Sequence, residues 1–184
     1  MQPHAHTQAT IDILAEAEEI SRPVDRVMAY YFRNNRYIGS KDKKAIAELV
    51  YATLRQQGLI DWGLQQVGLP QNARLRVATQ LVLSGDGAET HFNGERFAPR
   101  ELNQKEQALF EIPQKIAHAP LYAQLNYPAW AGELLKNTFG DDIAEAMDAL
   151  NQQAPTDLRL NTLRATKDEA AAALKKEGFS GERT

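Results

Sequence analysis

The stretch YYFRNNRYIGSKDKKAIAELVYATLR, residues 30–55, decides the fold class of this chain. Its second half has apolar or small side chains at the i, i+3, i+4, i+7 and i+8 spacing of a helix that buries one face. These positions are Ile46, Leu49, Val50, Thr53 and Leu54. This helix would begin after Gly39 and end at Gly58. An earlier helix would be capped by Ser21 and would run to about Arg36. The stretch therefore predicts two consecutive amphipathic helices.

Positive charge gathers in and beside this stretch, although the chain as a whole has a formal net charge of -3. Residues 22–55 hold eight Lys/Arg and three acids, whereas the rest of the chain is strongly acidic. At about 100° per residue, the four arginines of the first helix share one face about 80° wide. The opposite face carries the apolar or aromatic residues Val24, Val27, Met28 and Tyr31.

This basic face is the first candidate site, and phosphate is its expected ligand. Its members are Arg22, Arg26, Arg33, Arg36, Lys41, Lys43, Lys44 and Arg55. A charged helix face is often merely solvated, but most of these residues are arginines, which bind phosphate in a bidentate manner. They also lack the interspersed Glu that ordinary surface helices carry as i, i+4 partners. RNA phosphates are the better explanation of the pattern.

Composition excludes several other classes of protein. The chain has no cysteine, so it holds no disulfide, no cysteine metal site and no thiolate nucleophile. No apolar run approaches a membrane span, and the N-terminus lacks the pattern of a signal peptide. We expect no membrane partner, no metal and a cytoplasmic location. His4 and His6 are expected in a mobile N-terminal segment, and Trp62 and Trp130 in the core.

Helices are expected over most of the remaining chain. The first would cover residues 11–20, and two more would cover residues 59–67 and 69–83. Residues 84–102 are rich in Gly and polar residues and predict one long loop, in which Asn93-Gly94 favours a tight turn or small hairpin. Asn103 and Glu106 have the spacing of a capping box that opens another helix.

After about Pro120 the sequence predicts helices followed by a strand. A helix that stops at Gly140 and another to about Gln152 are followed by DLRLNTL, residues 157–163, which alternates as a strand does. A capping box and an Ala-rich helix then complete half of a β–α unit, and the chain stops before a partner strand appears. Arg159 and Asn161 would share one face of the strand and are further RNA-contact candidates, although such a pair is more often merely solvated.

Several stretches together resemble a known family. RYIGSKDKKAIAELVYATLR is similar to the helical N-terminal region of bacterial RNA (cytosine-5) methyltransferases of the Sun/Fmu (RsmB-like) type, a region that resembles the RNA-binding factor NusB. NYPAWAGELLKNTFGDD is similar to the family's N-x-P-x-W segment. APTDLRLNTLRATKDEAAAALKKEGF is similar to the motif that opens the family's small RNA-contacting α/β subdomain.

This resemblance implies a mainly α chain with two parts. Residues 1–120 would form a NusB-like helical RNA-binding domain, and residues 121–184 the incomplete N-terminal subdomain of the methyltransferase core. The family's chemistry lies in a further domain that binds S-adenosylmethionine and uses two cysteines, and we expect that domain to be absent from this chain. The chain would therefore hold no catalytic or cofactor-binding residue itself, and would position RNA of the 16S ribosomal type for the complete rRNA methyltransferase.

Two other readings stay open at this level. A stand-alone NusB-like RNA-binding or antitermination factor explains the basic helices but leaves the strand-helix unit of residues 157–178 without a role. A helical adaptor for another protein would leave the basic face solvated and would bind RNA weakly or not at all.

Overall fold

The computed structural model describes residues 1–152, 154 and 157–180, and the chain divides into two compact units, residues 1–152 and 153–184. Among the described residues the regular elements are all helical and none is a strand, which confirms the expectation of a mainly α chain. Each unit is described by itself below.

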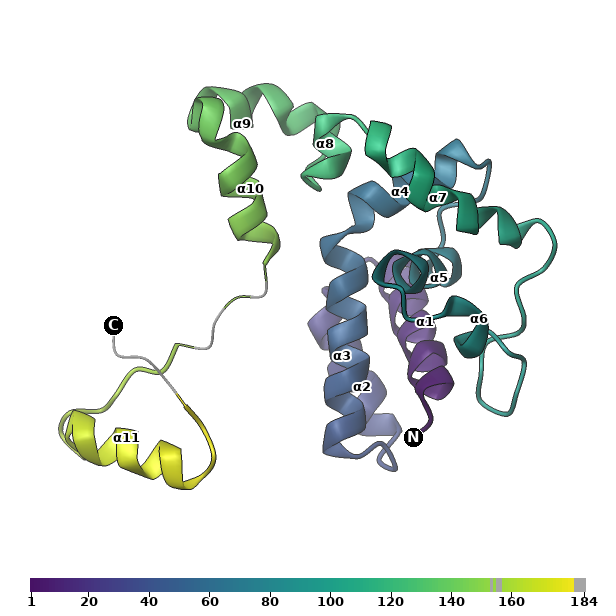
Figure 1. The fold of residues 1–184 in the computed structure, drawn as a ribbon. Coiled ribbons are helices and arrows are strands. Elements are labelled where there is room, and N and C mark those ends of the chain that lie inside the picture. The colour runs from purple at the N-terminus through teal and green to yellow at the C-terminus, as the bar shows by residue number, and fades with distance from the viewer. Residues whose placement is uncertain (153, 155–156, 181–184) are drawn as a thin grey trace. The chain divides into compact units, whose positions relative to one another are not determined.

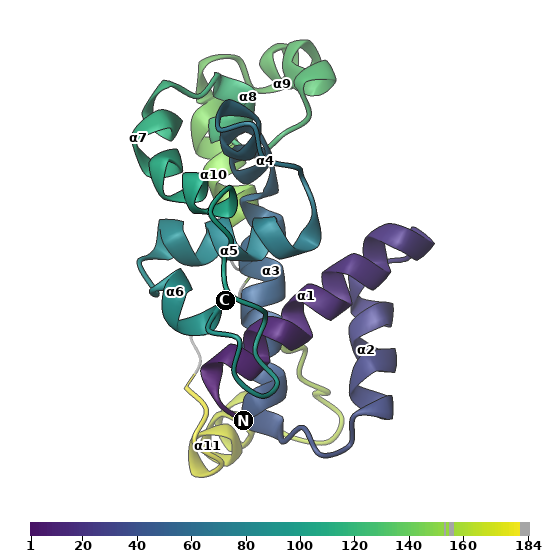
Figure 2. The same cartoon turned by 90° about the vertical axis from the view of Figure 1, so that its right-hand side faces the viewer.

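Six α-helices occupy the first two thirds of the first unit (Figures 1 and 2). They are α1 (Pro3–Ile20), α2 (Val24–Asn34), α3 (Ser40–Arg55), α4 (Gln57–Gln66), α5 (Ala73–Ser84) and α6 (Ala88–His91). Helix α1 packs against α2, α3 and α5, and α4 packs against α5. The bundle is therefore built around the contacts of α1 with its neighbours.

After the loop that follows α6, the rest of the first unit consists mainly of short helices and 3₁₀ turns. They are η1 (Glu106–Glu111), α7 (Ile112–Lys115), η2 (Ile116–His118), α8 (Leu121–Gln124), η3 (Ala129–Ala131), α9 (Gly132–Phe139), η4 (Gly140–Asp142) and α10 (Ile143–Asn151). Helices α9 and α10 contact each other, and the Asn151 side chain donates to the Leu125 carbonyl at 2.9 Å. In the second unit the described helix is α11 (Lys167–Lys176).

The hydrophobic core lies within the first unit and follows the apolar periodicity of the sequence. Fully buried members come from α1, α3, α4 and α5, as in Ile13, Ile46, Ile60 and Val77. On α3, the expected stripe is buried at Ile46, Val50 and Thr53 and half-buried at Leu49 and Leu54. The 3.6-residue pattern therefore identified the correct inward face.

The N-terminus differs from its expectation. Helix α1 begins at Pro3, not at residue 11, and Ala5, Thr7 and Ala9 are buried. The Nε2 atom of His6 lies 2.8 Å from Asp42 Oδ1, so this segment is packed and the expectation of a mobile N-terminus is wrong. Burial of small side chains on one face of α1 explains the difference, because close packing of helices favours small residues.

Two helix boundaries were misplaced, and a predicted capping box opens a different kind of helix. Ser21 adopts a left-handed conformation that ends α1, and the residue before α2 is Pro23, so Ser21 does not cap α2. Gly58 lies inside α4, because α3 already ends at Arg55. The Asn103–Glu106 capping contacts do form, with each backbone N–H donating to the other side chain at 3.0 Å, but they open the 3₁₀ turn η1.

The structure contradicts two further predictions, the burial of the two tryptophans and the strand at residues 157–163. Trp130 is 77% exposed, so it is not a core residue, and Trp62 is only half-buried. The described residues 157–163 form no strand, although the Thr166–Glu169 capping box after them is present at the start of α11. A strand needs a neighbour to accept its backbone hydrogen bonds, and the described part of the chain offers none.

Candidate nucleic-acid interface

The basic face is carried by α2, α3 and the turns that flank them. Arg26 and Arg33 lie on α2, seven residues and therefore about 10 Å apart along one face. Arg22 precedes α2 and Arg36 follows it, so the prediction that all four arginines share one helix is wrong. Helix α2 is shorter than predicted because it begins only after Pro23 and ends before Asn35. The backbone N–H of Asn35 donates to the Tyr31 carbonyl.

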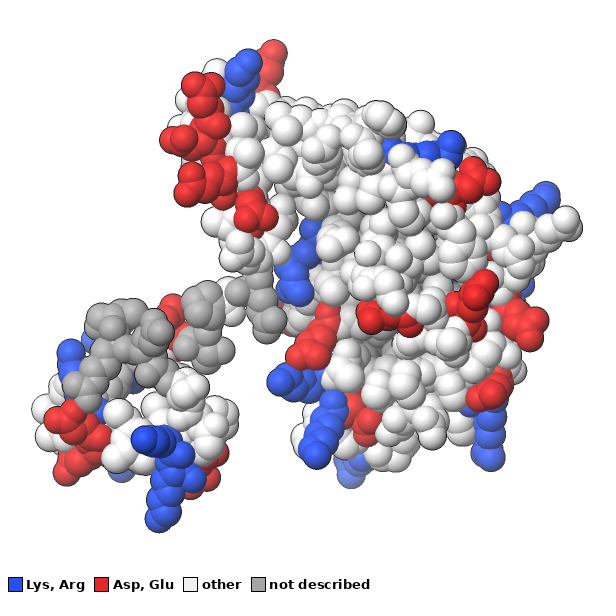
Figure 3. All heavy atoms as spheres, in the orientation of Figure 1, with Lys and Arg blue, Asp and Glu red and all other residues white. Residues whose placement is uncertain are grey.

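The four arginines on and around α2 are exposed, and the described residues offer them no ion pair. Arg22, Arg26, Arg33 and Arg36 are all exposed, and none has a salt bridge to any residue that the structure describes. Their guanidinium groups are therefore available to a ligand. Figure 3 shows several Lys and Arg side chains projecting from the lower end of α2 and α3, whereas acidic side chains gather over α9 and α10.

Helix α3 supplies the lysines, which differ from one another. Lys41 is exposed, whereas the Lys43 ammonium lies 5.8 Å from the centre of the Phe32 ring and helps to join α3 to α2. Lys44 has an i, i+4 ion pair with Glu48 at 3.7 Å, so the expectation that the basic residues lack such partners is wrong at this position. Because both side chains are exposed, that pair is weak and yields easily to a phosphate.

An acid at the start of α3 is paired with the N-terminal amine of the same unit. Asp42 Oδ1 accepts from the N-terminal amine at 2.7 Å and lies 2.8 Å from His6 Nε2. The hydrogen bond from the amine, followed by that from His6, lowers the pKa of Asp42 to about 2. The carboxylate charge therefore does little to offset the lysines beside it.

Aromatic side chains hold α2 in place beneath its arginines. The Tyr31 hydroxyl donates to Asp12 Oδ2 of α1 at 3.3 Å, and the Tyr31 and Phe32 rings meet edge to face at 6.2 Å. Burial and the charge of Asp12 raise the pKa of Tyr31, so its phenol stays protonated and keeps donating. Val27 and Met28 are buried on the same side, which leaves the Arg26–Arg33 face outward.

The second group of candidates lies in the second unit. Arg159 and Asn161 are exposed, but they do not share a strand face. Asn161 begins a turn instead, in which its side-chain oxygen accepts from the Leu163 backbone N–H at 3.1 Å. An Asn side chain bound to its own backbone in this way favours a turn over a strand. The prediction of a paired RNA-reading surface there is therefore wrong in its geometry.

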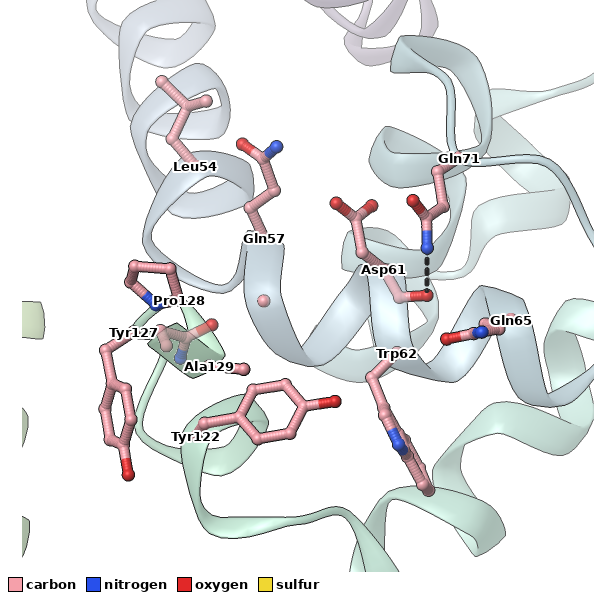
Figure 4. A pocket seen from close by; sticks show the side chains of 12 residues that line it. Leu54, Gln57, Asp61, Trp62, Gln65, Gln71, Tyr122, Tyr127, Pro128 and Ala129 are labelled. Atoms are coloured by element: carbon pink, nitrogen blue, oxygen red, sulfur yellow. Dashed lines mark hydrogen bonds between the residues drawn. The ribbon is translucent and has the colours of Figure 1, made fainter. Parts of the chain in front are cut away.

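Sequence reasoning missed a hollow beside α4, which the structure places next to the end of α3 (Figure 4). It has a volume of about 460 Å³ and lies between α4 and residues 122–129. Its lining includes Gln57, Asp61, Trp62, Gln65 and Tyr122. The signal was the spacing of Trp62 from Gln65 and Asp61 on one helix, but nothing in the sequence brings residues 122–129 to that helix.

The described residues do not fit S-adenosylmethionine, the cofactor that the family resemblance implies. Open α/β domains bind such cofactors at a glycine-rich loop between a strand and a helix. Here Gly85 and Gly87 lead into α6, which has only four residues, and no described strand precedes them. Grouped His, Cys, Asp or Glu side chains suited to a metal ion are likewise not found in the part that the structure describes.

A comparison of sequences relates the C-terminal part of the chain to a family. The family model described as the RsmF/B-like methyltransferase, ferredoxin-like domain, matches residues 127–184. Over these residues the chain is similar to that domain. The match is consistent with the methyltransferase class that the sequence predicted. No curated protein matches the chain.

A comparison of structures gives a fold relative for the whole chain. The solved structure titled "Crystal Structure of PH0851" has a TM-score of 0.59 and 19% sequence identity, with 100% of this chain covered. This chain spans only 47% of that one. At this identity the similarity concerns the fold alone. Among the described residues, no helix is long and apolar enough to cross a membrane.

Proposed function

We propose that this chain is the RNA-engaging portion of an S-adenosylmethionine-dependent rRNA (cytosine-5) methyltransferase, with a NusB-like helical domain at residues 1–120. The observation that carries the RNA-binding role is the set of exposed arginines on and around α2 that have no ion pair to any described residue. The match of residues 127–184 to the RsmF/B-like domain supports the enzyme class. Methyl transfer itself would belong to the cofactor-binding domain of the complete enzyme.

The basic residues of α2, α3 and their flanking turns are suited to positioning RNA. Arg22, Arg26, Arg33 and Arg36, with Lys41, Lys43, Lys44 and Arg55, would contact phosphates and fix the path of the strand. Phosphate contacts carry no sequence information, so the choice of nucleotide would rest on other residues. Ribosomal RNA of the 16S type in the cytoplasm remains the proposed substrate.

A stand-alone NusB-like antitermination factor is the alternative. It would use the same basic surface, but the match of residues 127–184 to a methyltransferase domain gives it no support. A protein adaptor is the third reading, and it predicts no RNA binding that responds to salt.

The test reverses two charges on the proposed surface. We expect Arg33→Glu with Arg36→Glu to weaken binding of a 20-nucleotide single-stranded RNA at least tenfold, with the helical circular dichroism unchanged, because both side chains are exposed. Lys105→Glu with Lys136→Glu is the matched control, since it makes the same charge change at two exposed lysines away from α2 and α3.

Salt gives a second readout on the unaltered chain. If about five phosphates are neutralised, affinity for this RNA falls roughly 100-fold between 50 and 200 mM salt. Equal weakening by both double variants would remove the α2–α3 surface from the proposal. RNA binding that is absent, or insensitive to salt, would favour the adaptor reading.

A further inference from the structure

The hollow beside α4 combines flat aromatic side chains with side-chain amides. Trp62 from α4 and Tyr122 from α8 both line it, and Figure 4 shows the hydroxyl end of Tyr122 directed toward the Trp62 ring. Both residues are half-buried, so each ring keeps an accessible surface. Aromatic rings of this kind are the usual platforms on which unpaired bases stack.

The amides around these rings are available for hydrogen bonding. The Gln57 and Gln65 side chains line the hollow, and neither has a hydrogen bond to another residue that the structure describes. Gln71 donates from Nε2 to the Asp61 carbonyl at 3.0 Å, which leaves its own side-chain oxygen as an acceptor. A carboxamide offers both donors and acceptors, which is what the edge of a nucleobase requires.

The one acid of the lining does not repel an anionic ligand. Asp61 accepts from Arg76 in a bidentate manner, with Oδ1 at 2.6 Å from Nε and Oδ2 at 2.9 Å from Nη2. The lining includes no Lys or Arg, so the hollow lacks a site for phosphate. Its chemistry therefore suits a neutral, planar, polar-edged group, and not a free nucleoside triphosphate.

Basic side chains lie along α3, the helix whose C-terminal end borders the hollow. Leu54 and Gln57 line it, and Arg55, which lies between them in sequence, has no ion pair among the described residues. At about 100° per residue, Lys44, Tyr51 and Arg55 fall within about 40° of one another on α3. Lys44 and Arg55 are eleven residues and thus about 16 Å apart along the helix. A strand whose phosphates followed this line would reach the end of α3 where Leu54 lines the hollow.

We propose that the hollow beside α4 receives one unpaired nucleobase of the bound RNA, which stacks on Trp62 or Tyr122 and is read by the Gln57 and Gln65 amides. This inference rests on the proposed function, since it needs RNA on the α3 surface. It adds a site that specifies a base to a surface that contacts only phosphates. An apolar side chain of a partner protein would fit less well, because it would bury these amides without partners.

The first experiment uses Trp62 as its own reporter. The full chain with Trp130→Phe has Trp62 as its sole tryptophan, since the sequence holds two. A 20-nucleotide single-stranded RNA is added, and then a backbone of the same length in which every base is absent. We expect the complete RNA to quench the Trp62 fluorescence by stacking, and the abasic strand to bind through its phosphates with little quenching.

A matched pair of variants tests the amide without disturbing the fold. Gln65→Glu places a negative charge in the hollow, whereas Gln66→Glu makes the same change at the adjacent exposed residue, which does not line it. We expect Gln65→Glu to weaken binding of the complete RNA about tenfold relative to Gln66→Glu, and to leave binding of the abasic strand equal in the two variants.

The outcomes separate the two proposals. Salt-dependent RNA binding with unchanged Trp62 fluorescence, and equal affinities for the two glutamate variants, would overturn the nucleobase site while leaving the proposed function in place. Quenching by the abasic strand to the same extent as by the complete RNA would also overturn it, because no base would be needed. Absence of binding by either strand would overturn both proposals.

Discussion

At the scale of single residues, Arg74 is the most connected polar side chain of the first unit. Its guanidinium donates to both carboxylate oxygens of Glu106 at 3.1 Å and to the carbonyls of Arg100 and Glu101 at 3.0 and 3.1 Å. It also lies 4.8 Å from the centre of the buried Phe92 ring. Arg74 thereby ties the loop that follows α6 to α5.

Glu106 needs this partner because it is only 6% exposed. Burial raises the pKa of Glu106, but hydrogen bonds from Arg74 and from the Asn103 backbone outweigh that effect, and the pKa lies below its usual range. Arg74→Met keeps most of the side-chain stem but leaves a buried, poorly compensated carboxylate. We expect it to lower the free energy of unfolding by about 3 kcal/mol, measured by urea denaturation.

The control for this prediction also removes the buried carboxylate of Glu106. Arg74→Met with Glu106→Met is expected to recover part of the lost stability, because no buried charge is then left unpaired. A double variant as unstable as the sum of the two single variants would show that packing of Arg74, and not its charge, accounts for the loss.

At the scale of elements, the approach of α4 to α7 depends on one residue without a side chain. A Cβ atom added at Gly63 would lie 2.6 Å from Cγ2 of Ile112, which is fully buried. Alanine favours a helix over glycine by about 1 kcal/mol, but forcing a methyl group into a filled core costs about 1–3 kcal/mol. We expect Gly63→Ala to lower the melting temperature.

The same contact supplies a compensating change. Leucine has no methyl group in the Cγ2 position, so Gly63→Ala with Ile112→Leu should recover stability relative to Gly63→Ala alone. Valine at residue 112 would keep that methyl group and serves as the comparison. If Gly63→Ala were neutral or stabilising, the two helices would have room to separate and this account of their packing would be wrong.

Elements also show where sequence reasoning succeeds and where it stops. The apolar stripe of α3 and the Thr166–Glu169 capping box were predicted correctly, because each depends on residues three or four apart on one helix. The prediction of a strand at residues 157–163 was wrong, because strand pairing depends on a distant segment. The hollow beside α4 was missed for the same reason, since Trp62 and Tyr122 come from separate elements.

The candidate interface was predicted in part. Sequence placed the Arg26–Arg33 face outward, and the structure agrees, because two residues seven apart lie on one side of a helix. The sequence did not show that Asp42 would pair with the N-terminal amine and form a hydrogen bond with His6, since these contacts join residues about forty positions apart. Local periodicity therefore predicted which face of α2 is exposed, whereas long-range contacts influence the charge of the basic surface.

At the scale of the whole molecule, stability should depend on pH through a histidine that joins α1 to α6. His91 Nδ1 lies 2.7 Å from the hydroxyl of Thr7, which is fully buried. Burial lowers the pKa of His91, and the nearby His4 and His6 lower it further against an opposing effect of Asp86. The folded state therefore binds this proton less readily than the unfolded chain, where the pKa is about 6.5.

The sign of the effect follows from this difference in proton binding. Above the unfolded pKa both states hold a neutral imidazole, so His91 contributes nothing to the pH dependence. As the pH falls below about 6.5, the unfolded chain gains the proton first and folding becomes less favourable. We expect the free energy of unfolding to fall between pH 7.5 and pH 5.5, and His91→Gln to reduce that fall, as measured by urea denaturation. His118→Gln, at an exposed residue, should keep the full fall. An identical fall in the wild type and in His91→Gln would assign the acid sensitivity of the bundle to other groups.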